Sequence, residues 1–256
     1  MKPVIAKDTP IRALSVALTV AVVCALAVSL AAVTLRPMYL ANLEQERVGR
    51  LMAILDALSA QGRSFTIAEI ETRVVRLDDG AFDDDIDPDQ YDARKASREL
   101  DTSIALAPDD DIAGIRRRAN HAVVYLARQK SGRPDVLILP VYGIGYQSAL
   151  LGYLALDGNG RDILALRFYE QGETPGLGSR IQEPDWEALW QGKRAFADDG
   201  SVTISVGGSG HSGSTSRVDG ISGATRTTQG VDALVRFWLG ENGFGPFLAR
   251  AREGDI

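Results

Sequence analysis

The stretch DVLILPVYGIGYQSALLGYLALDGNGRDILALRFYEQ, residues 135–171, decides the fold class. It holds three runs rich in Val, Ile, Leu and Tyr, at 135–143, 150–157 and 163–171, with glycine-containing turns between them. Such runs between turn residues are typical of β-strands, and residues 123–128 form a fourth. Because strands follow one another with few helices between them, we expect an α+β domain with a mixed or antiparallel sheet rather than a doubly wound one.

Helical periodicity marks both ends of the chain. In residues 37–58, apolar side chains recur every three or four positions, which predicts a connecting helix. A second pattern predicts a helix from Thr228 to Leu239, with Val231 and Trp238 on its apolar face and Gly240 as its stop. Shorter segments predict a strand within 65–77, a short helix at 186–192 and a strand at 202–206.

An uncharged apolar segment runs from Ala13 to Leu35. As a helix rising about 1.5 Å per residue it spans roughly 34 Å, enough to cross about 30 Å of hydrocarbon. The apolar region of a cleavable signal peptide is shorter, so the segment predicts an uncleaved membrane anchor. Basic residues precede it at Lys2, Lys7 and Arg12, which favours a cytoplasmic N-terminus.

These features predict four regions. They are a cytoplasmic N-terminus at 1–12, a single transmembrane anchor at 13–35, a connecting helix at 36–60 and an extracytoplasmic domain at 61–256. In a bacterium with two membranes, the expected location is the inner membrane, with the C-terminal domain in the periplasm.

Composition excludes several kinds of site. The net charge of −6, without a basic stripe, argues against nucleic-acid binding. Cys24 is the only cysteine, so an intrachain disulfide, a thiolate zinc site and a cysteine-ligated iron–sulfur cluster are excluded. His121 and His211 do not form a ligand-spaced pair, and the acidic runs at 82–92 and 108–111 lack the EF-hand pattern. No metal site is expected.

The segment DGISGAT, residues 219–225, opens the last predicted helix. Gly220 and Gly223 allow a sharp turn and a close approach of the backbone to a ligand. The first amides of a helix lack intrahelical partners and favour anions, so a phosphate would fit beside Thr225, just ahead of the helix. The plainer interpretation is that serine and threonine here only cap the helix.

A serine nucleophile is a further alternative. The run from Gly220 to Ala224 nearly matches the G-x-S-x-G elbow around Ser222, with alanine in the last position. However, no histidine follows Ser222 in the chain, as that fold requires. A membrane-anchored serine hydrolase is therefore the less favoured hypothesis.

DGISGAT resembles the flavinylation motif of the FMN-binding domain family, in which the last threonine is joined to FMN by a phosphoester. That threonine is Thr225 here. Four segments in order resemble the family of C subunits of bacterial sodium-translocating NADH:quinone reductases: GETPGLG (172–178), WEALWQGK (186–193), VDGISGAT (218–225) and FWLGENGFGPFL (237–248).

The G subunit of Rnf-type electron-transport complexes shares motifs of the ETPGLG and SGAT type. The terminal GFGPFL and the long insert after the anchor favour the C subunit of the reductase. Residues 60–135 carry no recognised motif.

The resemblance implies an electron carrier that is not catalytic alone. Its covalent FMN would pass single electrons inside a membrane complex that oxidises NADH, reduces ubiquinone and pumps sodium outward. The implied partners are the other membrane subunits, membrane lipid and a magnesium-dependent flavin transferase that uses FAD as donor.

The resemblance also implies roles for individual residues. Thr225 would carry the phosphoester, and Ser222, Gly223 and Ala224 would shape the turn beside it. Residues of GETPGLG would border the flavin: Glu173, Thr174, Gly176 and Leu177. Pro175-Gly176 also predicts a type II turn. Arg226 is a candidate for neutralising phosphate, and Tyr142 and Tyr146 are candidates for contacts with the flavin ring.

Overall fold

The computed structural model describes residues 10–129, 132–208 and 214–256. The chain divides into two compact units, Met1–Arg50 and Leu51–Ile256. Helix α1, Pro10–Ser59, begins in the first unit and ends in the second. In the first unit, Ala13–Leu35 is long and apolar enough to cross a membrane, as the sequence predicts.

The second unit is built on a six-stranded sheet with the order β1-β4-β5-β6-β7-β8, in which every neighbouring pair is antiparallel. The strands are β1 (Ile70–Arg76), β4 (His121–Ala127), β5 (Val136–Ile144), β6 (Ala149–Asp157), β7 (Asp162–Glu170) and β8 (Lys193–Arg194). The four strands expected between 123 and 171 are therefore confirmed, and so is the α+β class.

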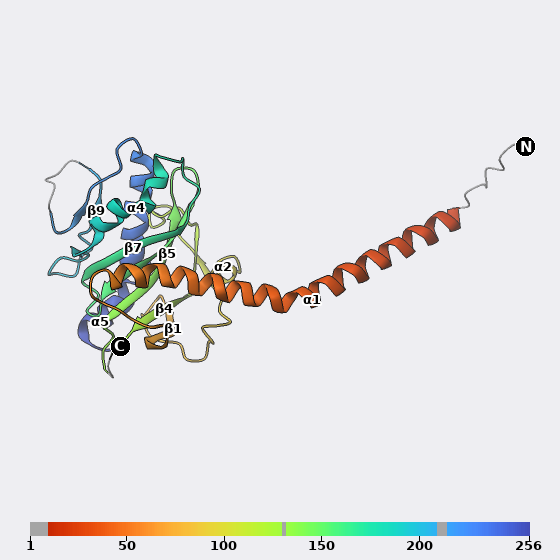
Figure 1. Ribbon diagram of the computed structural model, residues 1–256, viewed down its shortest axis with the longest axis horizontal. Coiled ribbons are helices and arrows are strands. Elements are labelled where there is room, and N and C mark those ends of the chain that lie inside the picture. The colour runs from red at the N-terminus through yellow and green to blue at the C-terminus, as the bar shows by residue number, and fades with distance from the viewer. Residues whose placement is uncertain (1–9, 130–131, 209–213) are drawn as a thin grey trace, which may run out of the picture. The chain divides into compact units, whose positions relative to one another are not determined.

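Each face of the sheet is covered by helix. One face packs against α4 (Thr225–Leu239) and α5 (Gly245–Glu253), which lie behind the sheet in Figure 1. The other face packs against the last part of α1, where Leu51, Ile54 and Leu58 are buried with Tyr125 and Tyr153. The end of the expected connecting helix thus belongs to the core of this unit.

Helix α4 approaches β5 closely at both ends. A Cβ on Gly230 would lie 2.7 Å from the carbonyl oxygen of Ile144, so only glycine allows this contact. Further along, the Nε1 of Trp238 donates a hydrogen bond to the carbonyl oxygen of Tyr142 at 2.7 Å. These two contacts fix α4 along the last residues of β5.

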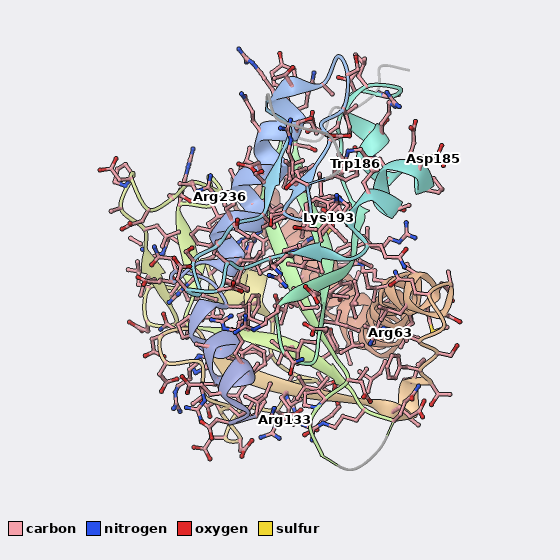
Figure 2. All side chains as sticks on the ribbon, turned by 90° about the vertical axis from the view of Figure 1, so that its left-hand side faces the viewer. Arg63, Arg133, Asp185, Trp186, Lys193 and Arg236 are labelled. Carbon is pink, nitrogen blue, oxygen red and sulfur yellow. The ribbon has the colours of Figure 1, made fainter. Side chains whose placement is uncertain are left out.

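Several expected boundaries are wrong. Helix α4 begins at Thr225 rather than Thr228. The expected strand at 202–206 is only β9 (Ser205–Val206), which pairs in parallel with β10 (Arg217–Val218). The expected helix at 186–192 is shorter: α3 (Pro184–Glu187) continues as a 3-10 turn to Trp190. Figure 2 labels buried Trp186 and exposed Asp185 side by side on α3.

Short elements fill the part of the chain without recognised motifs. Residues Ile67–Glu69 form a 3-10 turn before β1, so the expected strand covers only part of 65–77. Helix α2 (Ala93–Ala96) follows, and β2 (Ser103–Ala105) pairs with β3 (Arg117–Ala119) in antiparallel fashion. A last 3-10 turn, Gly178–Gln182, follows the GETPGLG loop.

Candidate functional site

The DGISGAT segment forms a tight turn that leads directly into α4. Gly223 has φ of +80°, which favours glycine, and the amide of Ala224 donates to the carbonyl oxygen of Ile221 at 3.0 Å. Thr225 is the first helical residue. The amide of Thr228 donates to the carbonyl oxygen of Ala224, so the three amides before it belong to the open first turn of the helix.

The capping interpretation of this segment is wrong. The N-cap position is occupied by Ala224, and no side chain caps the helix. Thr225 lies inside the helix and is exposed, and its hydroxyl makes no hydrogen bond within the described part of the chain. The threonine that stabilises the turn is Thr228: its buried Oγ1 accepts a hydrogen bond from the amide of Ile221 at 3.1 Å. The described part of the fold therefore leaves the Thr225 hydroxyl exposed and unused.

Glu173 is buried beneath this turn, with 4% of its surface exposed. Its carboxylate accepts hydrogen bonds from the amides of Gln147 (2.9 Å), Ser148 (3.1 Å) and Tyr146 (3.2 Å). It also accepts one from the Oγ1 of Thr227 on α4, at 2.5 Å. One side chain thus joins the loop after β5 to the first turn of α4.

The environment of Glu173 keeps it ionised. Burial opposes the charge, but the hydrogen bonds from Thr227 and from the amides of Gln147, Ser148 and Tyr146 outweigh that effect and lower the pKa of the carboxyl group. This carboxylate is enclosed by its donors and holds the loop after β5 against the first turn of α4. Its geometry is that of a residue that positions its neighbours.

The GETPGLG loop turns beside DGISGAT. The amide of Leu177 donates to the carbonyl oxygen of Thr174 at 3.1 Å, and Gly176 has φ of +72°. These are features of the expected type II turn. A Cβ on Gly223 would lie 3.3 Å from the Cδ2 of Leu177, and a Cβ on Gly178 would lie 2.6 Å from the Oγ1 of Thr227. The structure therefore brings both motifs together.

The two candidate tyrosines lie in different environments. Tyr146 is 52% exposed, and the guanidinium carbon of Arg226 lies 5.1 Å from its ring centroid. Tyr142 instead packs against Trp238, with ring centroids 4.8 Å apart, and burial raises its pKa to about 12. Tyr146 belongs to the site around Thr225, whereas Tyr142 does not.

The residues around Thr225 fit a phosphate ester of a flavin. An exposed hydroxyl meets the open first turn of a helix, where phosphate is favoured, and Arg226 supplies a positive charge. Tyr146 and Leu177, in the two neighbouring loops, present exposed apolar surface. No cluster of metal-ligating side chains occurs among the described residues.

Among the residues that the structure describes, Ser222 has no catalytic partner. Its side chain is exposed and makes no hydrogen bond to any described residue. His121 is bound to Asp83, with Nε2 3.0 Å from Oδ2, and His211 lies outside the described residues.

The FMN-binding domain family model matches residues 145–240, which contain Glu173, both loops and Thr225. The fold and the site therefore define an FMN-binding domain. The C subunit of the Na(+)-translocating NADH-quinone reductase of Vibrio alginolyticus is 39% identical and covers 97% of this chain and 98% of its own length. The C subunit of Pseudomonas aeruginosa is 40% identical at the same coverage. The chain belongs to the family of C subunits of the Na(+)-translocating NADH-quinone reductase.

Solved structures of C subunits are similar to this chain in fold and sequence. The crystal structure of Shewanella oneidensis NqrC has a TM-score of 0.67 and 35% identity, and the match covers 72% of this chain and 85% of that one. The structure of the C subunit from Parabacteroides distasonis has a TM-score of 0.53 and 29% identity, and the match covers 70% of this chain and 77% of that one. Family membership favours the reductase C subunit over the Rnf-type and serine hydrolase alternatives.

Proposed function

We propose that this chain is the electron-carrier subunit of a sodium-pumping NADH:ubiquinone oxidoreductase and holds FMN through a phosphoester to the Oγ1 of Thr225. The observation that carries the attachment site is the exposed Thr225 hydroxyl, unused by the fold, at the first residue of α4. The flavin supplies the redox chemistry when bound, and the chain holds and orients it.

In this proposal, different residues around Thr225 have different roles in holding the cofactor. The first-turn amides of α4 and Arg226 would bind the phosphate, and Tyr146 and Leu177 would offer apolar surface to the flavin ring. Ser222, Gly223 and Ala224 shape the turn. Thr174 and Gly176 hold Leu177 in place through their own turn. Glu173 positions both loops.

The attachment site is open to a modifying enzyme. Ser222, Gly223, Thr225 and Arg226 are all exposed, so a flavin transferase with FAD as donor can reach the hydroxyl. The other partners in this proposal are the membrane subunits of the complex and the lipid around the anchor.

The first test is flavin fluorescence after denaturation. The full-length chain, produced with a flavin transferase, is expected to give a fluorescent band under ultraviolet light on a denaturing gel. Ser222→Ala should keep most of this fluorescence, because it leaves the acceptor oxygen of Thr225 in place. A dark band for the unchanged protein would contradict covalent attachment, and a dark band only for Ser222→Ala would move the site to Ser222.

A topology assay tests the orientation. The chain is membrane-associated through its apolar helix, and we infer that residues 1–12 lie in the cytoplasm, 13–35 span the inner membrane, and 36–60 lead to a periplasmic domain at 61–256. Alkaline phosphatase fused to the C-terminus should be active, whereas a reporter active only in the cytoplasm should be silent. The reverse pattern would show that the orientation is wrong.

A further inference from the structure

A concave site lies apart from the residues around Thr225. Its volume is about 900 Å³, within the range of ligand and peptide pockets. Neither Thr225, Tyr146 nor Leu177 lines it. Its apolar floor includes Pro140, Ile144 and Leu151 from β5 and β6. Its other walls come mainly from residues 93–122, largely the part of the sequence without a recognised motif, together with Leu77, Tyr169, Glu170 and Trp238.

Two of the arginines that line this cavity have no ion pair within the described part of the chain. Arg94 is bound to Glu170 at 2.7 Å, and His121 to Asp83. The Asp111 carboxylate accepts two backbone amides, those of Ile115 at 2.8 Å and Arg116 at 2.7 Å. Arg98 and Arg116 are exposed and have no ion pair within the described part of the chain. On a chain of net charge −6, this rim favours an anionic partner.

The backbone at Arg116 supports a role for its side chain. Its φ is +63°, and no other described residue apart from glycines has a positive φ. A non-glycine residue in this region is strained, and such strain gathers at functional positions. Glycine would adopt this conformation more readily, so the fold keeps arginine here at the expense of stability.

Exposed apolar side chains occur at the cavity and close in sequence to its lining residues. Ile144 is 48% exposed, and Ile112 and Leu100, close in sequence to the lining residues Asp111 and Arg98, are 50% and 76% exposed. A small molecule would fill the hollow but leave these side chains in water. A polypeptide segment with apolar side chains would cover them as well as fill the hollow.

We propose that this cavity docks an acidic, amphipathic segment of another subunit of the reductase, with an apolar side chain in the hollow and carboxylates on Arg98 and Arg116. The proposal rests on family membership and not on Thr225 as the flavin site.

The test uses the purified reductase with all its subunits. A photoreactive benzoylphenylalanine in place of Ile112 is expected to crosslink to another subunit, at a peptide that contains both apolar and acidic residues. The double variant Arg98→Glu/Arg116→Glu should lower the crosslink yield and the recovery of this chain with the complex at least about tenfold. The matched control is Arg63→Glu, which changes an exposed arginine outside the cavity (Figure 2).

A third variant separates docking from folding. Arg116→Gly should keep or raise the melting temperature, because glycine relieves the positive φ, yet it should weaken recovery with the complex. Covalent flavin should be unchanged in all variants. Crosslinking to lipid or to no other protein of the complex, or equal recovery of the double variant and the Arg63→Glu control, would overturn the proposal.

Discussion

Thr225→Ala is expected to fold normally and to lose all covalent flavin. Alanine offers no oxygen to form the phosphoester. The Thr225 side chain is exposed and makes no hydrogen bond to a described residue, so its loss should change the free energy of unfolding by no more than about 0.5 kcal/mol. Intact-mass spectrometry of the variant, produced together with the flavin transferase, measures the loss directly.

Thr225→Ser is the matched control, because it restores a hydroxyl at the same helical position. We expect it to recover part of the flavin-sized adduct. Circular dichroism should show that both variants fold like the unchanged protein. If the adduct persisted on Thr225→Ala, the attachment site would lie elsewhere.

Glu173→Gln is expected to give the second large effect. The carboxylate accepts from Thr227 and from the amides of residues 146–148, and an amide cannot satisfy all these donors. At neutral pH we expect the free energy of unfolding to fall by roughly 2–4 kcal/mol. Because Glu173 holds the loop that carries Tyr146, flavin that remains attached should show a shifted absorption spectrum.

The pH dependence identifies the charge as the cause. The pKa of Glu173 is lowered in the folded state, so its stabilisation is complete above the unfolded glutamate pKa of about 4.3 and is lost as pH falls through the folded value. Urea denaturation should therefore show the difference between Glu173→Gln and the unchanged protein shrinking in acid. Glu183→Gln, at an exposed ion pair with Arg180, is the control and should have little effect. A pH-independent difference with an unchanged spectrum would reduce Glu173 to a packing role.

Strong local patterns made much of the fold predictable. The strands β4 to β7 are long, β-rich and bounded by turn residues, and α4 has a clear apolar face. Strands β8, β9 and β10 have two residues each, too few to show any periodicity. Helix α5 was missed, although Pro246 near its start and Gly254 just past its end, with φ of +82°, are signals that mark helix limits.

The part of the site that consists of contiguous sequence motifs was predictable. The resemblance implied that DGISGAT and GETPGLG both border the flavin, and the structure brings them close enough that a Cβ on Gly223 would lie 3.3 Å from the Cδ2 of Leu177. The role of Glu173 was not foreseeable, because its donors come from residues 146–148 and Thr227, which meet only when β5, the loop and α4 have packed together. The same holds for the rim formed by Arg98 and Arg116, which α2 and the loop before β3 bring to one cavity.

Peptide mapping tests the central claim most directly. Trypsin releases Val218–Arg226, a peptide whose only hydroxyl side chains are Ser222 and Thr225. If the bound group hinders cleavage after Arg226, the peptide extends to Arg236, and fragmentation that preserves the phosphoester still locates it. For the full-length protein produced with the flavin transferase, we expect the flavin phosphate on Thr225. A flavin on Ser222, on Thr227, on a different peptide or on none would contradict this account.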